Sequence, residues 1–184
     1  MTAGLVTVMS SEIVLVADTL CLDGATGAAI VGAEKLFVHG GKAAIFSWGI
    51  GPADVQEKVR SLDLLEARPE ALARALRERF QGVSAPYSFG LYIAGFDGEM
   101  PSLWHVDVPA SDSDTSDRSK IGGLWPVGPP GTGETLTEWL KLQWSMDPVS
   151  LGVGFVQKAH ALAPNEVGAD AKRIRVTARG AEWV

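Results

Sequence analysis

The segment GPPGTGET, residues 128–135, has the glycine spacing of a phosphate-binding loop. Such a loop follows the pattern G-x-x-x-x-G-K-[ST], in which backbone amides and a lysine ammonium hold the phosphate oxygens. Glu134 stands in the lysine position, where a carboxylate would repel phosphate. A turn leading into a helix is the better interpretation, because prolines restrict and glycines relax its backbone. Nucleotide binding is an alternative that rests on this segment alone, without a downstream Asp-Glu to hold magnesium.

The other side chains that could hold a metal are poorly spaced for it. The histidines at positions 39, 105 and 160 have no carboxylate or cysteine at a ligand spacing. The acidic segment 111–117, SDSDTSD, lacks the glycine and the terminal glutamate of a calcium loop. The one cysteine, Cys21, has no second thiol with which to share a metal. We expect neither a metal nor a cofactor.

Length and composition favour one soluble domain over residues 1–184. A chain of 184 residues is long enough to bury one substantial core. The net charge of -6 and the scattered basic residues argue against a nucleic-acid partner. The first residues of the chain alternate between apolar and polar types and contain no long apolar run. We therefore expect neither secretion nor a membrane partner. With a single cysteine, a reducing cytoplasmic setting is expected.

The elements that must position a site follow from hydrophobic periodicity. Apolar alternation predicts hairpins over 4–18, 34–51 and 172–184 and a strand pair over 86–98 and 101–108. Helical spacing predicts two helices within 52–80, broken at Pro69, and two more over 134–144 and 151–162. The polar segment 110–120 is predicted to be a surface loop. Because hairpins outnumber crossovers, we expect an α+β fold with antiparallel sheets and helices on their outer faces.

This element order and several motifs resemble the proteasome β subunits and their bacterial relatives, including the peptidase of the heat-shock-locus V type. The resemblance covers nearly the whole chain. It implies the N-terminal nucleophile (Ntn) hydrolase fold, a four-layer αββα sandwich in which two antiparallel sheets lie between helix layers. The motifs are Thr2 opening the first strand, VLVAD ending at Asp18, EKLF with Lys35, FSWGIGPAD with Gly49, and PYSFGLYIAGFDGEMPSLWHVD.

The resemblance also implies a threonine-type endopeptidase and assigns its catalytic residues. Thr2 would be the nucleophile once Met1 is removed, and its own α-amine, with a pKa of about 7.7 to 8.0, would be the base. Lys35 would lower the pKa of that amine and hydroxyl, and Asp18 would hold Lys35 charged and oriented. The backbone amide of Gly49 would stabilise the oxyanion.

Two family motifs differ in this chain. In the family, the serine of a Gly-Ser-Gly turn supports the terminal amine. The corresponding turn here is centred on Thr132, whose hydroxyl could replace that of the serine. Another register would place Pro129 or Pro130 at this position. A later Asp-x-x-Ser-Gly motif aligns with residues 165–169, so that Asn165 and Gly168 replace its functional side chains. Asn165 could accept a hydrogen bond but carries no charge, and Gly168 has no hydroxyl.

The pocket for the substrate side chain that precedes the cut bond can be assigned in the same way. Small residues at 33, 47 and 51 predict a roomy and mostly neutral pocket. The residues that the resemblance places there are Cys21, Ala33, Phe37, Ser47 and Gly51.

The resemblance further implies assembly into stacked homo-oligomeric rings that enclose the sites. Such a chamber admits unfolded polypeptide or peptide substrates, and an ATP-dependent unfoldase is the expected partner. Two alternatives keep the fold, namely an Ntn amidohydrolase acting on a small amide and a weak or inactive ring-forming homologue. The differences at 165–169 motivate both of them.

Overall fold

The computed structural model describes residues 2–22, 26, 28–30, 34–51, 55–63, 68–83, 87–109, 115–143 and 145–184. Met1, Ala33 and the segment 110–114 of the predicted acidic loop lie outside these residues. Within the described part, the elements in chain order are β1 (Gly4–Val8), β2 (Ile13–Asp18), β3 (Leu36–His39), β4 (Ala43–Ile50), α1 (Val55–Arg60), α2 (Pro69–Arg79), β5 (Ser88–Asp97), β6 (Met100–Val108), β7 (Thr115–Asp117), β8 (Leu124–Val127), α3 (Gly133–Leu142), α4 (Pro148–Leu162), β9 (Ala171–Thr177) and β10 (Gly180–Trp183).

The strands form two sheets of five. One sheet has the order β10-β9-β2-β1-β8, and the other has the order β3-β4-β5-β6-β7. Every pairing between neighbouring strands is antiparallel. The predicted α+β arrangement with antiparallel sheets and helices is therefore confirmed, as are the four predicted strand pairs.

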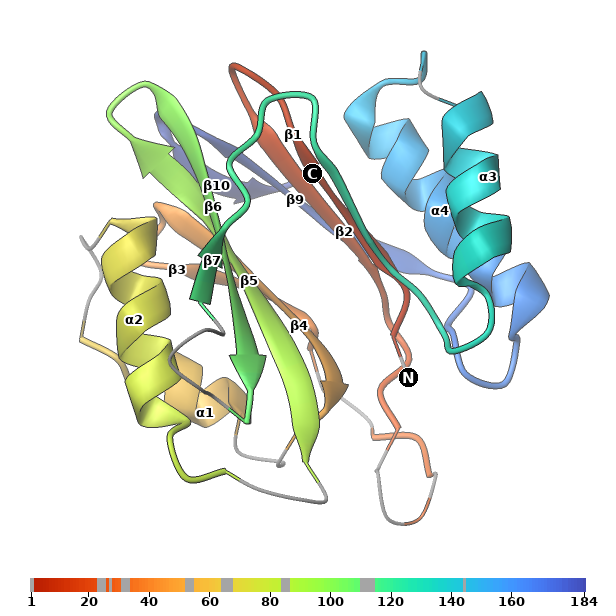
Figure 1. Cartoon of the computed structure of the whole chain (residues 1–184), viewed down its shortest axis with the longest axis horizontal. Helices are drawn as coiled ribbons and strands as arrows, with labels where there is room; N and C mark the ends of the chain where they lie inside the picture. Colours follow the sequence, from red (N-terminus) through yellow and green to blue (C-terminus); the bar gives the residue numbers. More distant parts are fainter. Residues whose placement is uncertain are drawn as a thin grey trace.

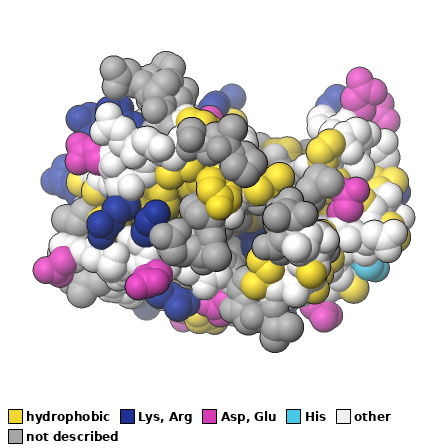
Figure 2. All heavy atoms as spheres, turned by 90° about the horizontal axis from the view of Figure 1, so that it is seen from below, with side chains coloured by type: hydrophobic (Ala, Val, Ile, Leu, Met, Phe, Trp, Pro, Cys, Tyr) yellow, Lys and Arg dark blue, Asp and Glu magenta, His cyan; other side chains and the backbone are white. Residues whose placement is uncertain are grey.

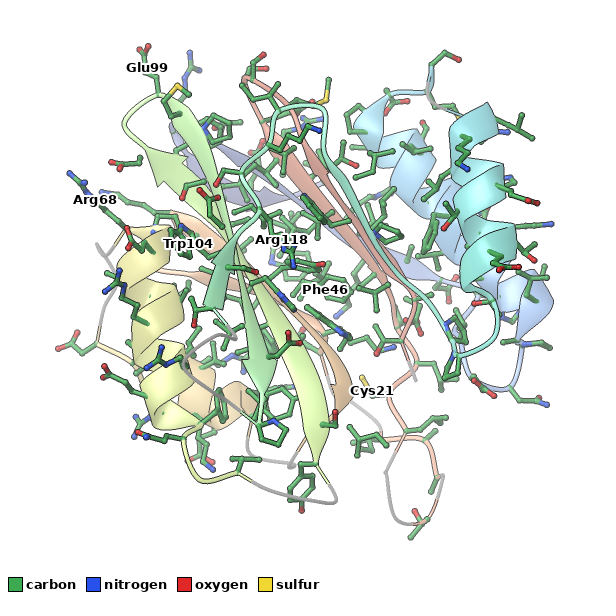
Figure 3. The ribbon with its side chains drawn as sticks, viewed as in Figure 1. Cys21, Phe46, Arg68, Glu99, Trp104 and Arg118 are labelled. Atoms are coloured by element: carbon green, nitrogen blue, oxygen red, sulfur yellow. The ribbon has the colours of Figure 1, made fainter. Side chains whose placement is uncertain are left out.

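The two sheets face one another, and the helices cover their outer faces (Figure 1). Helices α1 and α2 lie on the sheet that contains β4 and β5, whereas α3 and α4 lie on the sheet that contains β1 and β2. A separate apolar cluster fills each of the three interfaces between layers. The ring of Phe46 lies in the middle interface, between the sheets (Figure 3).

Strands β1 and β2 are buried at every position. One face of each strand contacts the opposite sheet, and the other face contacts α3 and α4, so neither face reaches water. That burial explains why their sequences are almost continuously apolar instead of strictly alternating. Strand β9 lies next to β2 but is more exposed, and only Ile174 and Val176 are fully buried in it.

Helix α4 is fixed at its start by a cap and along its length by a close approach to β2. Asp147 accepts hydrogen bonds from the amides of Val149 and Ser150, and Pro148 occupies the first helical turn. Hydrogen bonding by Ser150, first through its side chain and then through its amide, lowers the pKa of the Asp147 carboxyl. A Cβ at Gly152 would lie 2.3 Å from the Val16 side chain. The missing side chain allows the helix backbone to pack directly on the sheet.

Two strands depart from the predicted pattern. Residues 115–117, predicted as part of a surface loop, form the edge strand β7, so that prediction was wrong for these residues. Strand β8 was not predicted, and it pairs with β1. No helix in the described part of the chain is long and apolar enough to cross a membrane.

Candidate active site

The start of β1 brings Thr2 to the end of β2. The hairpin register pairs Gly4 with Ala17, so Ala3 lies opposite Asp18. The Asp18 amide donates to the Ala3 carbonyl at 2.9 Å, and the Ala3 amide donates to Asp18 Oδ1 at 2.8 Å. Thr2 is 6% exposed and directly precedes this double contact. The backbone therefore holds Thr2 beside a buried carboxylate.

Asp18 forms a buried ion pair with Lys35, which comes from the opposite sheet. Lys35 directly precedes β3, and its Nζ lies 2.6 Å from Asp18 Oδ1. The Lys35 side chain is 7% exposed, and the Asp18 side chain is 0% exposed. Burial lowers the pKa of Lys35 by disfavouring the ammonium, and the charge and hydrogen bond of Asp18 oppose that effect.

The second carboxylate oxygen of Asp18 is held by backbone amides. Leu20 N donates to Asp18 Oδ2 at 3.2 Å, and Gly168 N donates to the same atom at 3.0 Å. Both oxygens of this buried carboxylate thus have donors, as a buried charge requires. Together with Ala3 and Lys35, these contacts fix the orientation of Asp18.

Thr2 and Lys35 open into one cavity of about 150 Å³ at the end of the sandwich where the chain begins. Figure 2 looks onto this end, and hydrophobic side chains gather around the middle of the face. Cys21 lies beside the end of β4 (Figure 3). The cavity is lined by Thr2, Cys21, Leu22, Ile30, Glu34, Lys35, Ser47, Trp48, Gly49, Gly51, Val55, Gln56 and Phe89.

Gly49 has a backbone conformation that a side chain would not tolerate. Its φ is +94°, and a Cβ there would lie 2.5 Å from the Ser88 carbonyl oxygen. Ser47 donates its amide to the Lys35 carbonyl at 2.8 Å, on the β3 side of β4. Because amides two residues apart along a strand point the same way, the Gly49 amide faces that side too, towards the cavity that contains Thr2.

The predicted pocket residues are only partly brought together. Cys21, Ser47 and Gly51 line the cavity with Thr2. Phe37 does not line it, because the ring is buried in the cluster beneath α1 and α2. Ala33 lies outside the described residues. Sequence reasoning missed the apolar lining residues Leu22, Ile30, Trp48, Val55 and Phe89, which carry no catalytic chemistry that could single them out.

Thr132 is held within its own turn. Strand β8 ends at Val127, opposite Gly4, so the turn begins beside the start of β1. The Thr132 hydroxyl donates to the Pro129 carbonyl at 2.7 Å, and Thr132 precedes the first turn of α3. Thr132 is not among the residues that line the cavity. The hydroxyl proton of Thr132 is therefore engaged within the turn.

The segment at 165–169 reaches the site through its backbone. Gly168 donates its amide to Asp18, and the Thr19 amide donates to the Asp170 carbonyl at 3.1 Å. A Cβ at Gly168 would lie 2.9 Å from Leu20 N, so a serine would not fit there without movement. This segment therefore supports the Asp18 carboxylate through a backbone amide.

Glu34, next to Lys35, connects three layers of the structure at the edge of the cavity. Its carboxylate lies 2.7 Å from Arg60 of α1 and 3.1 Å from Lys172 of β9. Its backbone carbonyl accepts a hydrogen bond from Gln56 Nε2 at 3.0 Å. The residue thus ties one wall of the cavity, built from α1, to the opposite sheet.

The cavity also contains a thiol. Burial raises the pKa of Cys21, and the charge of Lys35 partly opposes that effect. Since the thiolate is the reactive form of cysteine, this shift makes Cys21 a poor nucleophile near neutral pH.

The cavity thus brings together the Thr2 hydroxyl, the buried Lys35 side chain and the Gly49 backbone amide. These are the kinds of group that nucleophilic acyl transfer requires. Across the residues that the structure describes, no group of three metal-binding side chains occurs. The sequence matches no protein-family model and no curated protein.

Proposed function

We propose that this protein is an Ntn hydrolase of the proteasome-like type that cleaves peptide bonds through an acyl-enzyme on Thr2. The two facing antiparallel sheets between helix layers are compatible with that fold. Thr2, Lys35 and Gly49 line one cavity, and Asp18 holds Lys35 at its base.

One observation carries the proposal. Asp18 Oδ1 accepts hydrogen bonds from both the Ala3 amide, at 2.8 Å, and Lys35 Nζ, at 2.6 Å. A buried ion pair between two sheets contributes little to stability, because desolvation offsets its attraction. Its placement against the residue that follows Thr2 is explained if the ion pair serves the chemistry of Thr2.

The acylation step needs a free α-amine, so Met1 must be removed. The amine accepts the proton of Thr2 Oγ1 as this oxygen attacks the substrate carbonyl carbon. The carbonyl π electrons move to the oxygen, and the Gly49 amide donates to the resulting oxyanion. As the C–N bond breaks, the protonated amine returns its proton to the leaving nitrogen, which leaves an ester on Thr2.

Deacylation reverses these roles with water. The α-amine accepts a proton from water as the water oxygen attacks the ester carbonyl, and the same oxyanion contact forms at Gly49. The tetrahedral intermediate then expels Thr2 Oγ1, which takes the proton back from the amine. The products are a carboxylic acid and the original enzyme.

Lys35 would tune this chemistry by its charge. A buried ammonium near Thr2 lowers the pKa of the α-amine and favours its neutral, proton-accepting form at neutral pH. Asp18 keeps the ammonium in place through a 2.6 Å contact. Burial already lowers the pKa of Lys35, so the carboxylate is what favours its charged form.

The cavity would hold the side chain that precedes the cut bond. Its lining is mostly apolar, with Leu22, Ile30, Val55 and Phe89 among the walls. A volume of about 150 Å³ suits one apolar side chain. Enclosure in a homo-oligomeric ring, and feeding by an ATP-dependent unfoldase, extend this proposal from the resemblance alone.

Mass spectrometry and a fluorogenic peptide panel test the proposal. We expect loss of Met1 in protein from its native host, and hydrolysis that Thr2→Ala abolishes. Thr7→Ala is the matched control. Thr7 is buried like Thr2 but lies within β1 and does not line the cavity. Retention of Met1, or equal activity of Thr2→Ala and the parent, would exclude Thr2 catalysis.

A second candidate keeps the fold and weakens the catalysis. The Thr132 hydroxyl is engaged with Pro129, and position 168 provides only a backbone amide. These observations favour a slow enzyme on small amides, or an inactive ring-forming homologue. Activity on a small amide without activity on peptides would favour the first, and assembly without either activity would favour the second.

A further inference from the structure

His160, on the last turn of α4, lies at the far end of a hydrogen-bonded connection to Asp18. Its Nδ1 lies 2.7 Å from the Val167 carbonyl oxygen. A carbonyl can only accept, so Nδ1 must carry the proton in this contact. The imidazole is therefore a donor to the turn that follows the helix.

The Val167 carbonyl and the Gly168 amide belong to the same peptide group. The oxygen of that group accepts from His160, and its N–H donates to Asp18 Oδ2 at 3.0 Å. Hydrogen bonds at both ends of one peptide polarise it in the same sense, so each strengthens the other. The far oxygen of Asp18 then accepts from Lys35.

The turn that carries this peptide is firmly packed. Val167 is fully buried in the cluster between α4 and the first sheet, and its amide donates to Ala163 at the end of the helix. A Cβ at Gly168 would lie 3.1 Å from Thr19 Oγ1 and 2.9 Å from Leu20 N. The peptide therefore has little room to turn unless one of its hydrogen bonds is lost.

From these contacts we propose that His160 is a positioning residue for the Asp18–Lys35 pair and acts through the Val167–Gly168 peptide. The proposal rests on the function proposed for Thr2, because the pair matters to catalysis only if that function holds. His160 touches no reacting atom in this scheme. It fixes the peptide, the peptide fixes Asp18, and Asp18 fixes Lys35.

Substitutions of His160 separate the donor from the bulk of the ring. Asn places an amide nitrogen where Nδ1 lies, Gln places one where Nε2 lies, and Leu removes the donor altogether. We expect His160→Leu and His160→Gln to lower kcat about fivefold with KM unchanged, as for the loss of one hydrogen bond. We expect His160→Asn to stay within about twofold of the parent.

A readout that does not depend on activity is the amide proton of Gly168 in NMR spectra. A peptide N–H that donates to a carboxylate resonates downfield, and we expect His160→Leu, but not His160→Asn, to move this signal upfield. If the parent has no peptidase activity, the proposed function fails while this measurement still decides the role of His160.

Gly168→Ala provides an independent check on the same connection. Its Cβ would force the peptide away from Leu20, so the variant should resemble His160→Leu, and the double variant should be little worse than either single one. Gly133→Ala is the control, because a Cβ at that position would meet no atom within 4 Å beyond its chain neighbours and the backbone of its own helix. An unchanged Gly168 signal in His160→Leu, Asn behaving like Leu, or additive effects in the double variant would overturn the proposal. If His160→Leu does not fold, the contrast between Asn and Gln decides it.

Discussion

Asp18 and Lys35 meet at 2.6 Å although they come from different sheets. Asp18 ends β2 in one sheet, and Lys35 precedes β3 in the other. Their ion pair therefore closes the space between the sheets at the end where Thr2 lies. Any change at either residue acts both on the contact between the sheets and on the candidate site.

Replacing Asp18 should cost more stability than replacing an exposed aspartate of an ion pair. In Asp18→Asn the Lys35 side chain, 7% exposed, loses its ion pair with Asp18, and we expect a loss of about 3 to 5 kcal/mol. Urea unfolding measures it. Asp97→Asn is the control, since Asp97 pairs with Arg68 at the surface and should cost less than about 1 kcal/mol. Equal losses would contradict the prediction.

Lys35 should make stability rise with pH in the alkaline range. Burial lowers its pKa below the ordinary value of 10.5, so between the two values the unfolded chain binds the proton more tightly than the folded one. The free energy of unfolding of the parent relative to Lys35→Met should therefore increase as the pH rises from the lowered pKa of Lys35 towards 10.5. Lys172→Met, at a half-exposed lysine, is the matched control for the loss of a lysine charge.

Tyr92 should act in the opposite direction at higher pH. Its side chain is 7% exposed and stacks on Trp48, and burial raises its pKa from 10.0 to about 12. The unfolded chain loses this proton first, so stability falls as pH rises from 10 to about 12, by roughly 2 kcal/mol.

Tyr92→Phe should remove that part of the pH dependence in denaturant titrations. The exposed Tyr87, changed to Phe, serves as the matched control. If the parent and Tyr92→Phe lose stability in parallel above pH 10, the buried phenol is not responsible.

Gly49→Ala should damage catalysis and stability together. At φ +94° a side chain is strained, and its Cβ would lie 2.5 Å from the Ser88 carbonyl oxygen. We expect a loss of about 1 to 3 kcal/mol of stability. If Gly49 is the proposed oxyanion donor, its displacement should lower kcat roughly a hundredfold. Gly133→Ala is the control in both assays, and a Gly49→Ala variant with parental kcat would remove Gly49 from the mechanism.

Much of the fold could be predicted because its hairpins are local. The alternation of apolar and polar residues, together with turn residues, predicted that β1 pairs with β2 and that β5 pairs with β6. Each of these pairs is connected by a short turn. Strand β7 was missed because its sequence, TSD, is polar and only three residues long. Strand β8 was missed because it contains Pro126 and lies between glycine-rich segments, and both features are typical of turns.

The site was harder to predict where it depends on backbone atoms. The contact between Gly168 and Asp18 joins residues 150 positions apart, and a glycine amide leaves no mark in a sequence. Sequence reasoning therefore interpreted Gly168 as a lost serine, whereas the structure gives its amide a partner. The ion pair of Asp18 and Lys35 was predicted because it depends on charged side chains, which can be recognised within sequence motifs.

The bridge from Glu34 to Arg60 and Lys172 makes the cavity sensitive to electrolyte. These side chains are 28%, 60% and 47% exposed, so dissolved ions reach them. The screening length falls from about 8 Å at 0.15 M salt to about 3 Å at 1 M, while the interior pair of Asp18 and Lys35 is shielded from it. Rising ionic strength should therefore loosen the wall built from α1 and raise KM, with kcat unchanged, in steady-state assays over a salt series. Salt should thus act on the exposed ion pairs at the cavity wall and leave the buried pair of Asp18 and Lys35 in place.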